Sequence, residues 1–105
     1  MSLDYQVEYY DEYAVLKLPE KVIIPYSSKF KDMLQELYAQ GYNKIVLDCN
    51  NLKMFDTAGI SGVAVYQKKL KEQNGDLRIT NVKDDYIKHL FKTIELHKIV
   101  NIEEI

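Results

Sequence analysis

The residues with the clearest chemical potential form the short segment Asp56-Thr57-Ala58-Gly59. An apolar run gives way there to an acid, a hydroxyl and two small residues, and a helical pattern follows. Thr57 is therefore expected near a helix N-terminus, which carries partial positive charge. Small residues at 58, 59 and, one turn later, Gly62 are expected to leave the Thr57 hydroxyl open to another protein's active site. Thr57 is thus a candidate phosphoacceptor, although Asp56 or Thr57 could equally cap the helix without further function.

The two histidines, His89 and His97, raise the alternative of a small enzyme. Hydrolysis through Asp56 and Thr57 would require a base within hydrogen-bond reach and a group that orients this base. The spacing of the histidines supplies neither, and we expect both to be surface or capping residues. Residues 56–62 also lack the GxxxxGK[ST] pattern of phosphate-binding loops. We therefore predict that the protein is not an enzyme.

The single cysteine, Cys49, follows an apolar run and is predicted to pack in the core. The chain has no second cysteine for an internal disulfide and no thiol neighbours for a zinc site. We therefore expect neither a metal nor a cofactor. The N-terminus lacks the basic start and apolar stretch of a signal peptide, which, with this cysteine content, predicts a cytoplasmic protein.

Length and composition indicate one folded domain whose partners are proteins. The chain has 105 residues, of which 47% are hydrophobic and 29% charged. This balance supports one hydrophobic core, so we predict a single domain over residues 1–105. The net charge is −2 with 14 scattered basic residues, which argues against nucleic-acid and anionic membrane partners. No apolar run approaches the roughly 20 residues of a membrane span.

The strands predicted around the Thr57 segment begin with a hairpin. Residues 5–10 and 13–18 are rich in aromatic and β-branched residues and flank the turn Asp11-Glu12. Ile45-Val46-Leu47 is a continuous apolar run of the kind buried on both faces of a sheet, and we predict that it is the central strand. Further short strands are expected at residues 77–80 and 99–102.

Three helices are predicted between these strands. Ser27 or Ser28 is expected to cap the first, which ends near Gly41, and Asp84 or Asp85 is expected to cap the third. The apolar residues at helical spacing are expected to face the core. They are Phe30, Met33, Leu34, Leu37 and Tyr38 in the first helix, Ile60, Val63, Ala64 and Leu70 in the second (residues 58–73), and Ile87, Leu90, Phe91 and Ile94 in the third.

The order of these elements, ββαβαβαβ, predicts an α/β fold. Helical crossovers join the strands after the hairpin, so we expect a mixed, mostly parallel sheet with helices packed on it. Partners of such sheets meet the carboxyl ends of the strands. The Thr57 segment follows the carboxyl end of the predicted central strand, and we expect the working site there.

Residues 45–75 resemble the signature of the STAS domain, the family named for sulphate transporters and anti-sigma factor antagonists. The shared pattern is an apolar strand ending in an acid or amide, a short loop, and then Asp-Ser/Thr-small-Gly-apolar at the start of a helix. Here these are IVLD at 45–48 and DTAGI at 56–60, and a glycine-containing turn follows at Gly75. The similarity extends weakly over nearly the whole chain and implies a single STAS-like domain.

The resemblance to the antagonist branch of this family implies a partner switch. The position of Thr57 is the residue that an anti-sigma factor of the Ser/Thr kinase type phosphorylates in that branch. The unmodified protein would capture the anti-sigma factor, the phosphorylated form would not bind, and a phosphatase would restore Thr57. The residues then expected to contact the partner are Asp56, Thr57, Ala58, Gly59, Ile60, Ser61 and Ile23.

Some residues depart from the antagonist pattern. Glu20 and Ile23 stand where antagonists usually have Gly and Asp, the acceptor is Thr instead of the commoner Ser, and Glu95 stands where Gly is frequent. Ile23 mildly favours an alternative within the same family. This alternative is a STAS adaptor subunit of a stress-signalling assembly or of a lipid-transport ATPase, which binds its partner without phosphorylation.

Overall fold

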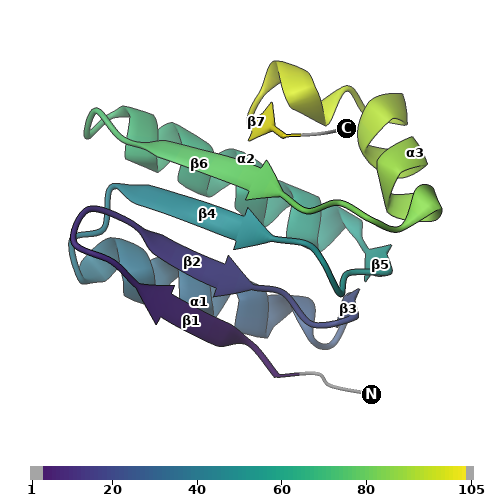
Figure 1. Ribbon diagram of the computed structural model, residues 1–105, viewed down its shortest axis with the longest axis horizontal. Coiled ribbons are helices and arrows are strands. Elements are labelled where there is room, and N and C mark those ends of the chain that lie inside the picture. The colour runs from purple at the N-terminus through teal and green to yellow at the C-terminus, as the bar shows by residue number, and fades with distance from the viewer. Residues whose placement is uncertain (1–3, 104–105) are drawn as a thin grey trace.

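The computed structural model describes residues 4–103 (Figure 1). The bounds of its elements are β1 Gln6–Tyr9, β2 Ala14–Lys17, β3 Lys21–Val22, α1 Ser27–Ala39, β4 Lys44–Asp48, β5 Met54–Phe55, α2 Thr57–Lys71, β6 Asp76–Thr80, α3 Asp85–Thr93, the short 3₁₀ helix η1 Leu96–Lys98, and β7 Asn101–Ile102. Apart from β3 and β5, this is the predicted order ββαβαβαβ. The mixed α/β fold class is therefore confirmed.

The main sheet has five strands in the order β1-β2-β4-β6-β7. The β1–β2 hairpin is antiparallel, with Tyr9 opposite Ala14, whereas β2, β4, β6 and β7 run parallel to one another. The carboxyl ends of β2, β4 and β6 therefore lie at one end of the sheet. Figure 1 shows β3, β5 and α3 gathered at that same end, on the right of the view.

Both crossover helices, α1 and α2, cover the same face of the sheet (Figure 1). The chain moves in one direction from β2 to β4 to β6, so each right-handed crossover places its helix on the same side. Ile45 and Leu47 face these helices and are fully buried, whereas Val46 between them is partly exposed. The prediction of burial on both faces is therefore wrong for Val46.

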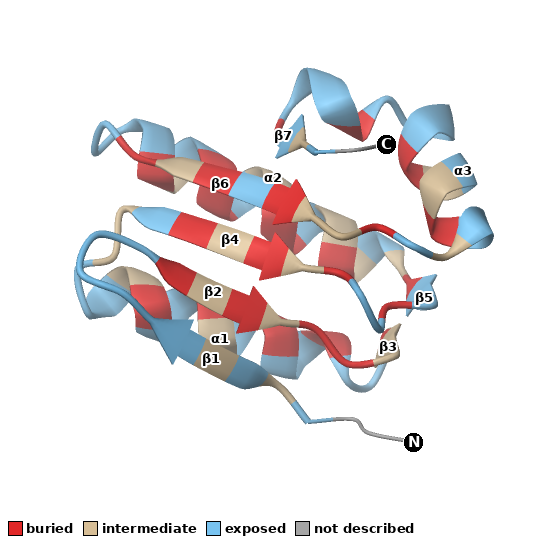
Figure 2. Cartoon of the chain, viewed as in Figure 1, coloured by how far each residue is buried: buried red, intermediate tan, exposed pale blue. Residues whose placement is uncertain are grey.

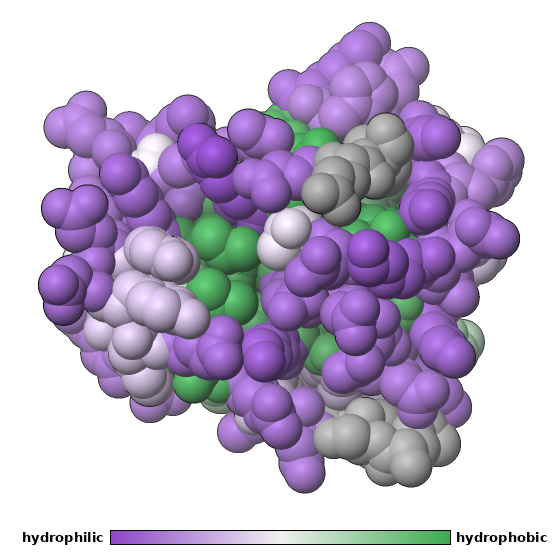
Figure 3. Space-filling view, in the orientation of Figure 1, coloured by the Kyte–Doolittle hydropathy of each residue, from purple (hydrophilic) through white to green (hydrophobic). Residues whose placement is uncertain are grey.

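The uncovered face of the sheet remains largely hydrophilic. Figure 2 shows that buried and less buried residues alternate along β2 and β4, as expected when only one face of a sheet is covered. Figure 3 looks onto the uncovered face and shows a small apolar area surrounded by hydrophilic side chains. The ion pairs Lys17–Glu8 and Arg78–Asp76 contribute to those surroundings, at 3.5 and 2.9 Å.

Three buried phenylalanine rings join the helices at the end where β5 lies. Phe55 of β5 packs edge-on against Phe30 of α1 and against Phe91 of α3, with 5.8 Å between ring centroids in both pairs. Edge-to-face packing of this kind adds about 0.5–1.5 kcal/mol to what the buried area provides. Phe55 is therefore fixed from two sides, and it supports the segment that follows it.

The start of α1 differs from the prediction. Neither Ser27 nor Ser28 caps this helix, because the residue before it is Tyr26, which has a helical backbone and no capping side-chain bond. Ser27 is buried, and its N–H already donates to the carbonyl of Ile23 at 3.0 Å. The Ser28 hydroxyl donates to the Pro25 carbonyl at 3.2 Å. A tight turn therefore starts this helix in place of a side-chain cap.

The end of α3 also differs, whereas the end of α1 is as predicted. Gly41 follows α1 with a φ of 96°, the left-handed conformation expected of it. Helix α3 ends at Thr93, and Ile94, which was predicted to be buried, is 38% exposed. Glu95 has a φ of 56° and turns the chain away from the helical path. Glycine adopts this conformation without a steric penalty because it has no Cβ. This is a physical reason for the glycine that is frequent at this position in the antagonist pattern.

Candidate functional site

The small second sheet, β3 with β5, builds the base of the candidate site. Its two strands are parallel, with Val22 opposite Phe55. The Lys53 N–H donates to the Glu20 carbonyl at 2.8 Å. The Asp56 N–H donates to the Val22 carbonyl at 3.1 Å. The segment that follows β2 is thereby held beside the segment that leads into α2.

Asp56 is the N-cap of α2. Its backbone is extended, with φ −105° and ψ 179°, and its Oδ1 accepts the Gly59 N–H at 2.9 Å. Its Oδ2 accepts the Ile24 N–H at 2.8 Å. Of the two capping residues that the sequence left open, Asp56 therefore fills the role, and Thr57 begins the helix.

Thr57 is exposed at the N-terminus of α2. Within residues 4–103 its hydroxyl has no hydrogen-bond partner. Ser61, one turn further along the helix, is also exposed, whereas Ala58 and Ile60 are half-buried. Thr57 is therefore at the surface, and the helix start does not depend on its hydroxyl because Asp56 is the cap.

Gly59 and Gly62 have a different role from the predicted one. Both are buried and face the core. A Cβ on Gly59 would lie 2.7 Å from Cε1 of Phe55, and one on Gly62 would lie 3.2 Å from Cε2 of Phe30. The predicted role of these two glycines in leaving the Thr57 hydroxyl open is therefore wrong, because both face the core and not the surface around Thr57. They let α2 approach the two phenylalanine rings closely, and Gly59 offers a partner no side chain.

An open depression of about 620 Å³ adjoins Thr57. It is lined by Ile23, by β5 with its neighbours, and by the first residues of α2 and α3. Lys53 lies in this lining with Asp56 and Asp84. Asp84 caps α3 by accepting the Ile87 N–H at 3.1 Å, so both carboxylates lie at helix N-termini. The positive ends of two helices therefore meet this depression.

Exposed apolar side chains around this depression were not identified from the sequence. Met54 and Tyr86 line it and are 42% and 59% exposed, and Ile24, next to Ile23, is 74% exposed. Met54 was taken as part of a loop. Tyr86 lies off the apolar stripe of the third predicted helix, and that position outside the stripe is the signal that could have marked it as exposed.

The structure does not bring the histidines to Thr57. His89 and His97 are both exposed, and neither lines the depression beside Thr57. The base that hydrolysis through Thr57 would require is therefore not supplied by either histidine.

Cys49 is buried as predicted, and its pKa is raised by that burial and then by the charge of Asp48. A thiol with a raised pKa is a poor nucleophile.

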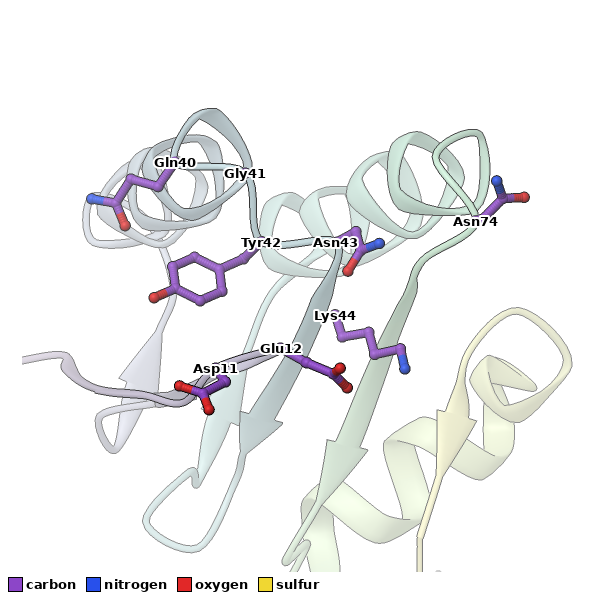
Figure 4. Close-up of a pocket in the computed structure, with 8 residues that line it drawn as sticks. All are labelled: Asp11, Glu12, Gln40, Gly41, Tyr42, Asn43, Lys44 and Asn74. Carbon is purple, nitrogen blue, oxygen red and sulfur yellow. The ribbon is translucent and has the colours of Figure 1, made fainter.

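A second depression, of about 700 Å³, lies at the opposite end of the parallel strands. Its lining includes Asp11 and Glu12 of the hairpin turn and Lys44 at the start of β4. In Figure 4 the Gln40 and Asn74 side chains lie at opposite margins of it and point away from each other. The Gln40 and Asn74 groups therefore do not face a common point, and the exposed Thr57 makes the other depression the stronger candidate site.

Among residues 4–103, no group of three or more metal-binding side chains is close enough to hold an ion. In the same part of the chain, no helix has the length and apolar character needed to cross a bilayer.

Several known structures with a similar fold are anti-sigma factor antagonists. One from Mycobacterium paratuberculosis has a TM-score of 0.86 at 14% identity, covering 99% of this chain and 87% of its own. The antagonist SpoIIAA in its unphosphorylated form has a TM-score of 0.69 at 18% identity, covering 85% and 82%. The Bacillus cell fate determinant SpoIIAA in its phosphorylated form has a TM-score of 0.72 at 17% identity, covering 94% and 90%. At these identities the likeness establishes the fold alone.

Comparison of the sequence with models of whole protein families identifies the family of this chain. A search among curated proteins returned no match. The family model of the STAS domain, by contrast, matches residues 4–104, almost the entire chain. That match includes the hairpin, the parallel strands and residues 45–75, on which the resemblance was based. The chain therefore belongs to the STAS domain family.

Proposed function

We propose that this protein is an anti-sigma factor antagonist that works by phosphorylation-controlled partner switching. Unmodified, it binds an anti-sigma factor of the Ser/Thr kinase type at the surface around Thr57. Phosphorylation of Thr57 by that kinase ends binding, and a phosphatase restores the hydroxyl. The observation that carries the proposal is the exposed Thr57 at the N-terminus of α2. The antagonists among the structural neighbours, one of them phosphorylated, support it.

The surroundings of Thr57 suit a protein partner. Met54 and Tyr86 line the adjoining depression and Ile24 follows Ile23 there, all three with substantial exposure. Exposed apolar and aromatic side chains of this kind are enriched in protein interfaces, where their burial supplies binding free energy. In the proposed complex they surround the acceptor, so a charge added at Thr57 lies within the interface.

The physics of the switch follows from that location. A phosphate adds about −1.5 to −2 charge, next to the carboxylate of Asp56. Burying such a group against a surface that does not match it costs several kcal/mol. In the free protein, the dipole of α2 stabilises the phosphate by about 0.3–1 kcal/mol. Phosphorylation is therefore tolerated by the fold but opposes the complex.

A second candidate function is a STAS adaptor subunit of a stress-signalling assembly or of a lipid-transport ATPase. The apolar Ile23 in the lining beside Thr57 favours it, because such a surface can bind a partner constitutively. The two candidates differ in whether Thr57 controls binding.

Co-purification of the protein from its own cells, followed by mass spectrometry of Thr57 before and after stress, identifies the partner and the modification. With that partner in hand, we expect Thr57→Glu to abolish binding and Thr57→Ala to retain it. Asp56 remains as the cap in Thr57→Ala, so its free energy of unfolding should stay within about 0.5 kcal/mol of the wild type.

The matched control is Thr93→Glu, which introduces the same charge at an exposed threonine. Thr93 is the last residue of α3, whereas the depression beside Thr57 is lined by Tyr86 near the start of that helix. It should leave binding unchanged. A partner that binds Thr57→Glu as tightly as the wild type contradicts the switch and supports the adaptor. A Thr57→Ala variant that fails to fold contradicts the assignment of Thr57 to an interface.

A further inference from the structure

The carboxylate of Asp56 joins two segments that are far apart in the sequence. Oδ1 accepts the Gly59 N–H at 2.9 Å, within the first turn of α2. Oδ2 accepts the Ile24 N–H at 2.8 Å, from a residue 32 positions away. Each oxygen thus has a separate backbone donor, and one side chain connects the segment after β3 to the N-terminus of α2.

The segment that Asp56 holds belongs to the apolar surface beside Thr57. Residues 23–26 include Ile24 and Tyr26, which are 74% and 41% exposed, and Ile23, which lines the depression. Within residues 4–103, the other hydrogen bonds of residues 23–26 run among themselves or to the start of α1. The bond between Asp56 and Ile24 is therefore what fixes this apolar segment relative to α2 by hydrogen bonding.

A phosphate on Thr57 acts directly on this connection. It brings about −1.5 to −2 charge and three strong acceptor oxygens to the residue after Asp56. Those oxygens compete for the free N–H groups at the helix N-terminus, and their charge repels the carboxylate that accepts from Gly59 and Ile24. Among the residues that line the same depression, Lys53 carries the positive charge.

We propose that Asp56 is the positioning residue of the docking surface and that phosphorylation acts partly through it. The Asp56 carboxylate fixes the Ile24 segment beside Thr57 in the form that the anti-sigma factor binds. Phosphorylation of Thr57 weakens the bond to the Ile24 N–H, so the apolar segment is displaced from its docking position while the added charge opposes contact. This inference rests on the proposed function, because it assigns the Ile24 segment to the same interface.

The test is the amide of Ile24, followed by NMR in ¹⁵N-labelled protein without any partner. Phosphothreonine at position 57 and the Thr57→Glu variant should both speed hydrogen exchange at Ile24 by about tenfold, the effect expected from losing a bond to a charged acceptor. Ser61→Glu places a charge one turn further along α2, at an exposed residue. It should leave the Ile24 amide unchanged.

Asp56→Asn separates positioning from capping. The asparagine oxygen can still accept from the Gly59 N–H, but its NH₂ group is a donor and cannot accept from Ile24. We expect fast exchange at Ile24 with slow exchange retained at Gly59, and about tenfold weaker binding of the co-purified partner at a temperature where the variant is fully folded. A purely structural role would leave the folded variant binding its partner as tightly as the wild type and would not single out the Ile24 amide.

The outcomes separate this inference from the proposed function. If phosphorylation abolishes partner binding but leaves exchange at Ile24 as slow as in the wild type, the inference fails and the proposed function stands. If Asp56→Asn frees the Ile24 amide without weakening the complex, the Ile24 segment lies outside the interface and the inference also fails. If Thr57→Glu binds normally, the proposed function fails whatever the amide shows.

Discussion

Asp56 and Thr57 are neighbours with opposite hydrogen-bonding states. Both carboxylate oxygens of Asp56 accept backbone N–H groups, whereas Thr57 is exposed beside it. A bond from a backbone N–H to a charged acceptor contributes about 1.5–3 kcal/mol. The fold therefore depends on the acid, and the hydroxyl next to it is free to change chemically. This division makes a modification site compatible with a stable helix start.

Gly59 shows how closely packing constrains the same turn. An added Cβ would lie 2.7 Å from Cε1 of Phe55, whose ring is held between Phe30 and Phe91 and cannot easily move. We expect Gly59→Ala to lower the free energy of unfolding by about 1–3 kcal/mol, because overpacking outweighs the higher helix propensity of alanine. Urea denaturation measures this change.

The control for Gly59→Ala is Ser61→Ala, on the same helix but exposed. Its free energy of unfolding should change by no more than about 0.5 kcal/mol. Equal stability of the two variants would mean that the Phe55 ring has room to shift.

Among the elements, α2, β6 and the chain after η1 are joined by one buried amide. The Oε1 of Gln67 accepts the Leu77 N–H at 2.8 Å, and its Nε2 donates to the Ile99 carbonyl at 3.1 Å. Gln67 is only 6% exposed. This side chain satisfies backbone groups of two segments at once, which the helical pattern of the sequence did not reveal.

We expect Gln67→Met to lower the free energy of unfolding by about 2–3 kcal/mol. Methionine fills a similar volume but leaves the buried Leu77 N–H without an acceptor, which alone costs about 1–3 kcal/mol. Gln73→Met is the control, because the Gln73 amide donates to the Tyr38 hydroxyl at an exposed position. Thermal unfolding measures the stability of both variants. An equal fall in the two melting temperatures would contradict the expectation.

At this scale the sequence predicted the long elements and the short strand β7, but it missed β3, β5 and η1. The apolar spacing of Phe30, Leu34 and Leu37 identified α1 because many residues repeat one pattern. Strands β3 and β5 have two residues each, so no period could mark them, and they form only through pairing with each other. These two strands form the base of the candidate site beside Thr57. Asp56 and Thr57 were therefore found by residue type, while the nearby Ile24 and Met54 were not.

For the whole molecule, the direction of the chain across the sheet decides what is covered. The strand order β2-β4-β6 progresses one way, so right-handed crossovers put α1 and α2 on one face. The alternation of elements in the sequence predicted parallel strands, but nothing in the pattern indicated the order of the strands across the sheet. The apolar run at 45–47 was consequently assigned to a strand buried on both sides, and Val46 is the residue for which this assignment was wrong.

The one-sided sheet predicts different costs for neighbouring residues of β4. Leu47 is fully buried against the helices, so Leu47→Ala should lower the free energy of unfolding by about 2–5 kcal/mol. Val46 lies on the uncovered face and is partly exposed, so Val46→Ala should cost less than about 1 kcal/mol. Leucine loses one more methylene than valine, which accounts for only about 0.8 kcal/mol of that difference. Urea titrations with unchanged m-values measure both costs, and a Val46→Ala loss as large as that of Leu47→Ala would mean that a further layer covers this face.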